Sequence, residues 1–311
     1  MENRNEFGKL LAVLFTLMPS YAGAETLTED VLSIEAEIPR NGSNIAYGHA
    51  ALWVASGFVA LRVDPEDNSV QEIKLDGASQ RQRRIFVGEK AIWIPDAGAD
   101  KIYKIDPSTA EVALVIDADL LSSRGSITVW AGSVWAVTGE NFEKMLTRFN
   151  AESGAVEARI DIPSTGYGVA EAGGSIWVTS GMNGEVYRID PKNNALVQTV
   201  EIGGSPRLMV AGAGWLWVHD QADGSVKKID TETGEIVSTI STELPGGAGE
   251  IVYSDEGISL STPYTVQYLR IDTEMDTVRL MVIGRQGADD HAIGGGSLWL
   301  GGSKIRRVKL P

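Results

Sequence analysis

The 311-residue sequence predicts an all-β protein, a seven-bladed β-propeller, and three observations lead to this fold class. A triplet of a small residue, an apolar residue and Trp recurs every 40 or 42 residues, a basic-apolar-Asp step follows each triplet, and no helical periodicity separates them. Four short strands in about 40 residues are the size of one propeller blade. A β-helix would need much shorter coils, so we expect blades.

The Trp triplets set the register of the repeat. Six of the slots carry an indole, at Trp53, Trp93, Trp135, Trp177, Trp217 and Trp299, and Gly257-Ile258-Ser259 fills the remaining slot. A large aromatic side chain on the second strand of a unit can bury about 150–250 Å² in the gap between adjacent blades. We therefore predict that this column is structural.

A second column confirms the register, because each triplet is followed by a basic residue, an apolar residue and a turn-forming residue. The copies are Arg62-Val63-Asp64, Lys104-Ile105-Asp106, Arg148-Phe149-Asn150, Arg188-Ile189-Asp190, Lys228-Ile229-Asp230, Arg270-Ile271-Asp272 and, at the end, Arg307-Val308-Lys309. An Asx side chain can hold the backbone of the turn that follows, and Gly or Asn tolerates the left-handed φ that closes the hairpin. These features predict a third and a fourth strand in each unit.

The segment before the first Trp predicts how the ring closes. Ile38 precedes Trp53 by 15 residues, the spacing found in later units, so residues 31–38 have the pattern of an outer strand without a blade of their own. The last unit ends after its third strand. Pairing of Val31 to Ile38 with Lys304 to Lys309 would supply the missing strand and leave no open edge in the ring.

The first 24 residues have the pattern of a signal peptide. Arg4 and Lys9 precede the apolar run Leu10 to Met18, and Ala22-Gly23-Ala24 is the small-x-small pattern that a signal peptidase accepts. Cleavage after Ala24 would leave residues 25–311 as a single propeller domain. We expect a monomer that is exported, either periplasmic or secreted, and an uncleaved anchor is the alternative.

Composition excludes several classes of partner. The chain holds 42 acidic and 27 basic residues, a net charge of -15, so its field repels phosphate backbones and anionic lipid headgroups. We expect neither nucleic acid nor a membrane surface as a partner. The absence of Cys excludes disulfides and thiol chemistry, so packing alone must stabilise the exported form.

Segments such as Gly173-Gly174-Ser175-Ile176-Trp177-Val178-Thr179, followed by Gly184-Glu185-Val186-Tyr187-Arg188-Ile189-Asp190-Pro191, carry a family resemblance. Over about residues 31–311 the chain resembles the family that includes virginiamycin B lyase (streptogramin lyase) and the related YVTN and NHL propellers. The resemblance implies a propeller, and for lyase members a Trp-Phe-Thr-Glu motif, a loop His and a magnesium ion that assists elimination from a cyclic depsipeptide. The residues three past the Trp slots here are Ser56, Asp96, Thr138, Ser180, Asp220, Thr262 and Gly302, without a Glu.

The loops that precede the first strand of each unit meet on one face of a propeller and form its default site. Ten residues before the Trp slots stand Ser43, Arg83, Gly125, Tyr167, Arg207, Gly249 and Asp289, a variety that favours a pocket over packing. Arg83 and Arg84 could clamp a carboxylate or phosphate in the channel mouth, because a guanidinium makes bidentate contacts. Tyr167 and Arg207 suit the stacking and anchoring of a small anion. A solvated loop with local charge pairing is the alternative for the arginines.

A second set of residues could bind a metal ion. On a strand, Asp289 and His291 point to the same side. Together with His219 and Asp220 of another blade, they could ligate Mg²⁺ or Ca²⁺, with a His as a general base beside a polarised carbonyl. The alternative is a solvated loop with a hydrogen-bonded His.

Two function classes follow. The first is a binding module that presents its channel-mouth loops to a small anionic ligand, a peptide or a partner protein and needs no cofactor. The second is a metal-assisted lyase or hydrolase that uses His291, His219, Asp289 and Asp220 with a divalent cation. A quinone-dependent oxidoreductase ranks below both, because the sequence carries no redox-cofactor motif. The missing lyase motif favours the binding module.

Overall fold

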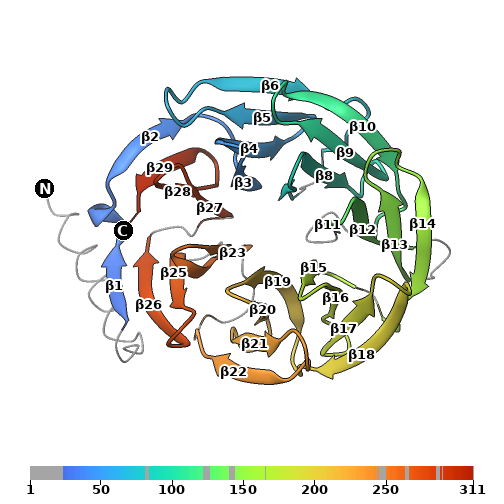
Figure 1. The fold of residues 1–311 in the computed structure, drawn as a ribbon. Helices are drawn as coiled ribbons and strands as arrows, with labels where there is room; N and C mark the ends of the chain where they lie inside the picture. The colour runs from blue at the N-terminus through green and yellow to red at the C-terminus, as the bar shows by residue number, and fades with distance from the viewer. Residues whose placement is uncertain are drawn as a thin grey trace, which may run out of the picture.

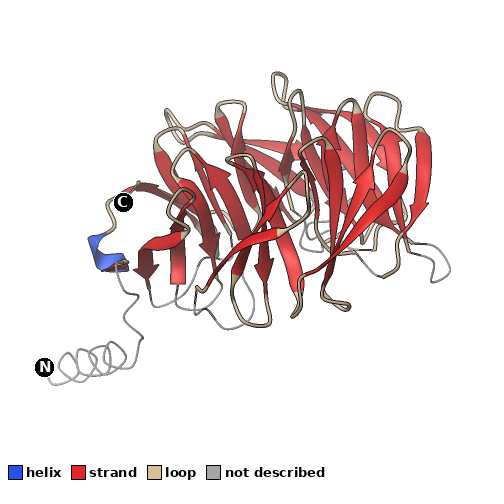
Figure 2. Ribbon diagram, turned by 60° about the horizontal axis from the view of Figure 1, so that its bottom comes forward, coloured by secondary structure: helices blue, strands red, loops and turns tan. Residues whose placement is uncertain are grey.

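The computed structural model describes residues 24–80, 84–121, 127–139, 144–164, 166–242, 244, 250–262, 266–284, 288 and 290–310. Its strands form seven sheets arranged in a ring around a central channel, as the sequence predicts (Figure 1). The strands cross the thickness of the ring, and loops lie on both of its faces (Figure 2). The fold class is therefore a seven-bladed β-propeller.

The first four blades each consist of four consecutive strands, numbered from the channel outward. Blade 1 comprises β3 (Ile45–Gly48), β4 (Ala51–Ser56), β5 (Val59–Val63) and β6 (Val70–Lys74). Blade 2 comprises β7 (Phe86–Val87), β8 (Ile92–Asp96), β9 (Lys101–Asp106) and β10 (Glu111–Asp117). Blade 3 comprises β11 (Ile127–Trp130), β12 (Ser133–Thr138), β13 (Met145–Asn150) and β14 (Val156–Asp161). Blade 4 comprises β15 (Val169–Ala172), β16 (Ser175–Ser180), β17 (Glu185–Asp190) and β18 (Ala195–Glu201).

The last three blades include the two ends of the chain. Blade 5 comprises β19 (Pro206–Gly212), β20 (Trp215–Asp220), β21 (Val226–Asp230) and β22 (Ile236–Ile240). Blade 6 comprises β23 (Glu250–Ser254), β24 (Gly257–Ser261), β25 (Val266–Asp272), β26 (Thr277–Ile283) and an added outermost strand, β1 (Glu25–Thr28). Blade 7 comprises β27 (His291–Gly294), β28 (Ser297–Leu300), β29 (Ile305–Lys309) and β2 (Ile34–Ile38).

The Trp column fills the seams, our term for the contact surfaces between adjacent blades. Each indole is at most 2% exposed and belongs to the same buried cluster as the apolar residue that stands eight positions before the Trp slot of the next blade. The pairs are Trp53 with Ile85, Trp93 with Ile127, Trp135 with Val169, Trp177 with Met209, Trp217 with Ile251 and Trp299 with Ile45. Four of the indole N–H groups donate to a backbone carbonyl, as when Trp177 Nε1 donates to the carbonyl of Ala172 at 3.0 Å, whereas Trp135 Nε1 has no partner among the described residues. The column is structural, as predicted.

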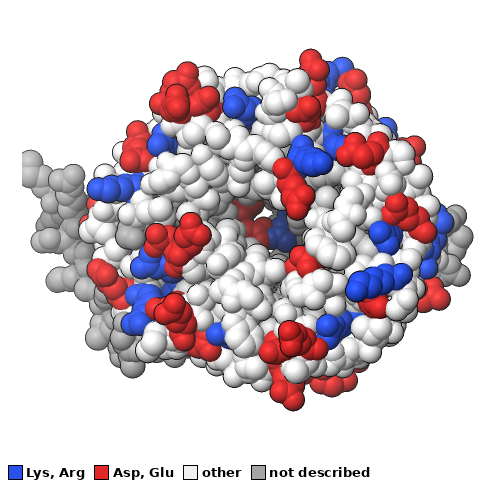
Figure 3. All heavy atoms as spheres, viewed as in Figure 1, with Lys and Arg blue, Asp and Glu red and all other residues white. Residues whose placement is uncertain are grey.

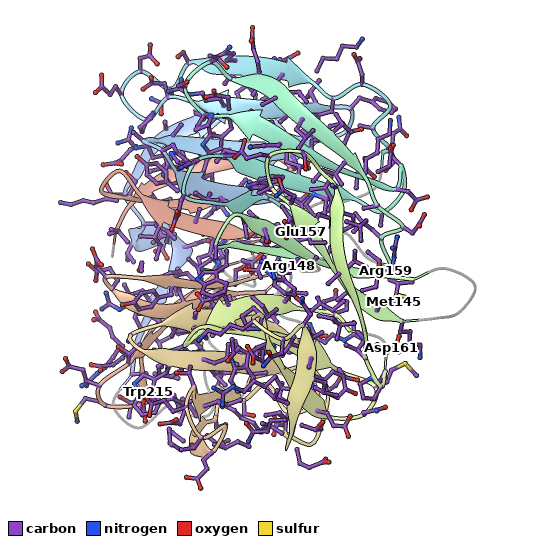
Figure 4. The ribbon with its side chains drawn as sticks, turned by 45° about the vertical axis from the view of Figure 1, so that its right-hand side comes forward. Met145, Arg148, Glu157, Arg159, Asp161 and Trp215 are labelled. Carbon is purple, nitrogen blue, oxygen red and sulfur yellow. The ribbon has the colours of Figure 1, made fainter. Side chains whose placement is uncertain are left out.

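The basic column on the third strand ties five of the blades to the next one. Arg148 stacks over Trp135, with Cζ 5.0 Å from the ring centroid, and its Nη1 donates to the carbonyl of Pro191 in the following blade at 3.0 Å. The same arginine forms an ion pair with Glu157 on β14, with Nε 2.9 Å from Oε2 (Figure 4). Equivalent interblade hydrogen bonds join Lys104 to Ala151, Arg188 to Glu232, Lys228 to Thr273 and Arg307 to Pro65.

The N-terminal segment closes the ring as the sequence predicts. Strand β2 pairs antiparallel with β29, with Ile34 opposite Val308 and Ile38 opposite Ile305. The strand is shorter than the predicted range, because Val31 lies in the 3-10 turn η1 (Glu29–Val31). Strand β1 was not predicted; it pairs in parallel with β26 of blade 6. The two N-terminal strands thus lie beside the last strands of the chain (Figure 1).

The predicted signal peptide falls almost entirely outside the described residues, which begin at Ala24. In the part of the chain that the structure describes, no helix has the length and apolar content needed to cross a membrane. Export of the protein therefore stays a prediction.

Candidate functional site

The inner strands of the seven blades surround a channel with a cavity of about 400 Å³. Its lining is largely aliphatic and aromatic, with Ile45, Phe86, Met209, Ile251 and Tyr253 among its residues. Acidic and basic side chains are visible inside this central hollow (Figure 3). Among the described residues that line the cavity, the charged ones are Arg84, Glu171 and Glu250.

An ion pair crosses the channel between Arg84 and Glu250. Arg84 precedes the inner strand of blade 2, and Glu250 opens the inner strand of blade 6, so the pair joins two blades that are not neighbours. Arg84 Nε donates to Glu250 Oε2 at 2.6 Å, and Arg84 Nη2 contacts Oε1. The side chains are only 13% and 11% exposed. Of the two predicted arginines, Arg84 therefore lies in the channel, and the Glu250 carboxylate compensates its charge.

A second cation, Arg207, lies next to the channel lining, since Arg207 stands two residues before Met209, and Tyr167 directly before Gly168, both of which line the cavity. The Arg207 guanidinium stacks over the Tyr167 ring, with Cζ 4.9 Å from the centroid. Tyr167 is half-buried, whereas Arg207 is exposed. The two backbones are also linked, because Thr179 Oγ1 donates to the Arg207 carbonyl at 2.7 Å and accepts from the N–H of Gly168 at 2.8 Å. Within the described residues, no carboxylate lies at ion-pair distance from Arg207.

His291 lies in the one seam without a Trp. It opens the inner strand of blade 7, is fully buried, and its Nε2 is 2.7 Å from Oγ of Ser259, the residue in the empty Trp slot of blade 6. The imidazole meets the Tyr268 ring edge to face at 5.7 Å between centroids. Burial lowers the pKa of His291 to about 3, so the ring is neutral at pH 7. Its Nδ1 has no hydrogen-bond partner among the described residues.

His219 and Asp220 end the second strand of blade 5. Burial lowers the pKa of His219 to about 4, although the neighbouring Asp220 carboxylate favours the charged ring. Asp220 Oδ1 accepts the backbone N–H groups of Ser205 at 2.7 Å and Ala222 at 2.9 Å, and Oδ2 accepts from Lys227 Nζ at 2.9 Å. Both carboxylate oxygens thus hold the local loops and a buried lysine.

The structure separates the residues predicted to bind a metal. His219 belongs to blade 5 and His291 to blade 7, with blade 6 between them. Two predicted residues, Arg83 and Asp289, lie outside the described residues. No group of three or more His, Cys, Asp or Glu side chains in the described part of the chain could hold a metal ion. The cation site stays a prediction that rests on Asp289.

Glu250 was not predicted as a site residue, although the sequence carries a signal for it. Nine residues before the Trp slots stand Asn44, Arg84, Ser126, Gly168, Leu208, Glu250 and Asp290. Three of these seven residues are charged, Arg84, Glu250 and Asp290, although the next position in each unit is apolar except at His291. This column therefore carries a signal for charged residues beside the inner strands, but it does not say which of them form a pair.

Comparison with solved structures identifies proteins with this fold. A streptogramin B lyase matches with a TM-score of 0.72 and 18% identity over 90% of this chain and 96% of the lyase. Virginiamycin B lyase from Staphylococcus aureus matches with a TM-score of 0.72 and 16% identity over 90% of this chain and 98% of that one. This chain shares the fold of the streptogramin lyases. The fold resemblance expected from the blade signature is thereby confirmed.

A third match comes from a different setting. The extracellular domain of a one component system from B. thetaiotaomicron matches with a TM-score of 0.66 and 16% identity, over 89% of this chain and 42% of that one. No family model matches the sequence, and no curated protein matches it. Because the identities are below 20%, the likeness concerns the fold.

Proposed function

We propose that this protein is an exported binding module that captures small ligands with an anionic group at the mouth of its propeller channel. The observation that carries the proposal is the exposed Arg207 guanidinium stacked on Tyr167, at a channel whose cavity measures about 400 Å³. A cavity of this size is in the range of about 300–1,000 Å³ that small-molecule sites occupy.

The Tyr167–Arg207 stack is suited to anion capture for two physical reasons. Stacking restricts the rotamers of the arginine before a ligand arrives, so less side-chain entropy is lost on binding. The guanidinium edge stays available to a carboxylate or phosphate, which it can hold with two parallel hydrogen bonds. Tyr167 lies on the loop before β15 and Arg207 at the start of β19, so rigid blades hold both residues in place.

Export is part of the proposal and rests on separate support. A basic start, a short apolar run and a small-x-small site precede the propeller in the sequence. The fold also occurs in an extracellular domain from B. thetaiotaomicron. Detection of the mature protein outside the cytoplasm, with Glu25 as its first residue, is the result expected from cell fractionation and N-terminal sequencing.

The binding proposal is tested by titrating the mature protein with a panel of small carboxylates and phosphates and measuring heat of binding. For the ligands that bind, Arg207→Ala should lower the affinity by tenfold or more. The matched control is Arg279→Ala, which removes an exposed arginine from the outer strand β26 and should leave binding unchanged. Equal affinities for wild type and Arg207→Ala would overturn the proposal.

The second candidate function is a metal-assisted lyase or hydrolase, which the shared fold with the streptogramin lyases favours. The described residues do not fit a metal centre, because the Asp220 oxygens are engaged with Lys227 and backbone groups, and the imidazoles of His219 and His291 are buried in different blades. Added Mg²⁺ or Ca²⁺ should raise the melting temperature if this function is correct, and a chelator should reverse the rise.

A further inference from the structure

The ion pair between Arg84 and Glu250 is placed where a ligand that passes the channel mouth would meet it. Its two partners come from blades 2 and 6 and are both nine-tenths buried or close to it. The third charged residue of the lining, Glu171, is directed to a hairpin, since its Oε1 accepts the backbone N–H of Gly174 at 2.9 Å. Among the described residues of the lining, the pair is therefore the charged feature that a ligand in the channel would contact.

We infer that the channel binds a zwitterionic ligand of amino-acid or short-peptide size, whose carboxylate replaces Glu250 on Arg84 and whose ammonium group replaces Arg84 on Glu250. The inference rests on the proposed function, because the ligand reaches the channel through the mouth at Tyr167 and Arg207. It adds the chemical class of the ligand to that function.

The electrostatics of the pair select for a ligand with both charges. A purely anionic ligand on Arg84 would place its charge beside the Glu250 carboxylate, and a purely cationic ligand on Glu250 would face Arg84. An uncharged ligand that separates the two would break an ion pair whose side chains are only 13% and 11% exposed, without replacing it, which is strongly unfavourable. A zwitterion compensates both charges at once, so it can exchange with the internal pair at the smallest electrostatic cost.

The rest of the channel lining indicates what the ligand carries between its charges. Phe86 lies under the guanidinium, with Arg84 Cζ 5.8 Å from the ring centroid. Met209, Ile251 and Tyr253 also line the cavity. These apolar side chains would contact an aliphatic or aromatic group, and the volume of about 400 Å³ suits a molecule no larger than a small peptide. An amino acid or dipeptide with apolar side chains meets all of these conditions.

The test compares three forms of one apolar dipeptide, leucyl-phenylalanine, by calorimetry with the wild-type mature protein. The free dipeptide is a zwitterion, its N-acetyl derivative is an anion, and its C-terminal amide is a cation. We expect the free dipeptide to bind at least tenfold more tightly than either blocked form. Binding of the N-acetyl form as tight as that of the free dipeptide would overturn the inference, as would the absence of binding by all three.

Substitutions in the pair provide an independent readout, because they should invert the preference. Glu250→Gln removes the carboxylate that pairs with Arg84 and should make the N-acetyl form the best ligand. Arg84→Gln should favour the amide in the same way. The double variant Arg84→Gln/Glu250→Gln removes both charges and serves as the control, in which the three forms should bind alike. Unchanged preferences in both single variants would contradict the inference.

Failure of this inference is distinguishable from failure of the proposed function. If Arg207→Ala weakens binding of the anion panel while the free dipeptide has no advantage over its N-acetyl form, the mouth site stands and the zwitterion site does not. If Arg207→Ala changes no affinity but the free dipeptide retains its advantage, the ligand class stands and capture by the stacked arginine does not.

Discussion

The seam between blades 4 and 5 and the seam between blades 6 and 7 solve the same packing problem with different chemistry. In the first, Trp177 shares a buried cluster with Met209, and Arg188 covers the indole and donates to the Glu232 carbonyl of the next blade. In the second, Ser259 stands in the Trp slot and is hydrogen-bonded to His291. Apolar area stabilises one seam, and a buried polar pair occupies the other.

The basic column also changes at the seam between blades 6 and 7. Arg270 is the residue that would reach the next blade, but blade 7 takes its outer strand from the N-terminus and so has no turn after its third strand. Arg270 Nη1 donates instead to Glu256 Oε2 at 2.8 Å, within its own blade. This seam therefore differs from the others in its packing, and Arg270, like Arg62 of blade 1, makes no interblade hydrogen bond within the described residues.

The N-terminal segment compensates for these differences from outside the ring. Residues 25–38, here named the strap, contribute β1 to blade 6 and β2 to blade 7 and so cross the seam at its outer edge (Figure 1). Leu27 and Leu32 pack against the buried cluster that contains Tyr268. Between the strands, Glu29 accepts from Gln267 Nε2 at 2.8 Å and lies 4.0 Å from Arg306. The seam at which the chain ends meet is thus held by backbone pairing.

Removal of the strap should have the largest effect on stability of the changes proposed for these two seams. A protein that lacks residues 25–38 loses both outer strands, exposes the edges of β26 and β29, and uncovers the buried cluster beneath them. We expect aggregation or loss of cooperative unfolding, measured by light scattering and calorimetry. A truncated protein that stays monomeric and melts in one sharp transition would contradict the role of the strap.

Loss of one indole should destabilise a conventional seam. Trp177→Ala removes a fully buried ring and should lower the free energy of unfolding by about 3–5 kcal/mol. Denaturant titration measures the change. Trp215→Ala is the matched control: this indole contacts Lys228 but is only partly buried, so its loss should cost less. Equal and small effects at the two positions would contradict a structural Trp column.

The seam between blades 6 and 7 should respond to pH. A neutral His291 with a pKa of about 3 in the fold takes up a proton in the unfolded chain below a pKa of about 6.5. Stability should therefore fall as the pH falls from 6.5 towards 3, by about 2 kcal/mol between pH 7 and pH 5 for this one group. The variant Ser259→Ala/His291→Ile lacks this dependence, so its stability should decline less steeply. Parallel curves for the two proteins would count against a buried neutral His291.

The smallest expected effect comes from the polar pair itself. Ser259→Ala leaves His291 Nε2 without its partner at 2.7 Å and should cost about 1–2 kcal/mol. Addition of His291→Ile restores the apolar residue found at this position in the other blades and should recover part of that loss. Chemical denaturation of the wild type, the two single variants and the double variant gives the free energies of unfolding for a double-mutant cycle. Additive losses would show that the two residues do not act as a pair.

Regular features of the chain were predictable from the sequence to the level of single residues. Trp53 and its counterparts mark the second strands, Arg148 and its counterparts mark the third, and the unpaired pattern before Trp53 predicted the antiparallel partner of β29. A repeated unit makes such features recognisable, because the same strand, turn and core positions recur in every blade. The parallel strand β1 has no counterpart in the repeat, so periodicity carried no signal for it.

The candidate site was predictable in part. Tyr167 and Arg207 were expected as binding residues, because both stand in the variable column ten residues before the Trp slots, but the stacking of one on the other became apparent only from the structure. The partnership of Arg84 with Glu250 was not, because 166 residues separate them and only the curvature of the closed ring brings blades 2 and 6 face to face. His291 was considered as a metal ligand, and its contact with Ser259 became apparent only from the packing of adjacent blades.

By itself the sequence determined the number of blades, their register and the closure of the last blade, because these follow from local strand and turn preferences repeated at one period. The tertiary structure alone decided which charges meet in the channel and which seam is polar. Those contacts depend on the distances between blades in a closed ring, and the spacing of residues along the chain does not encode which side chains face one another across it.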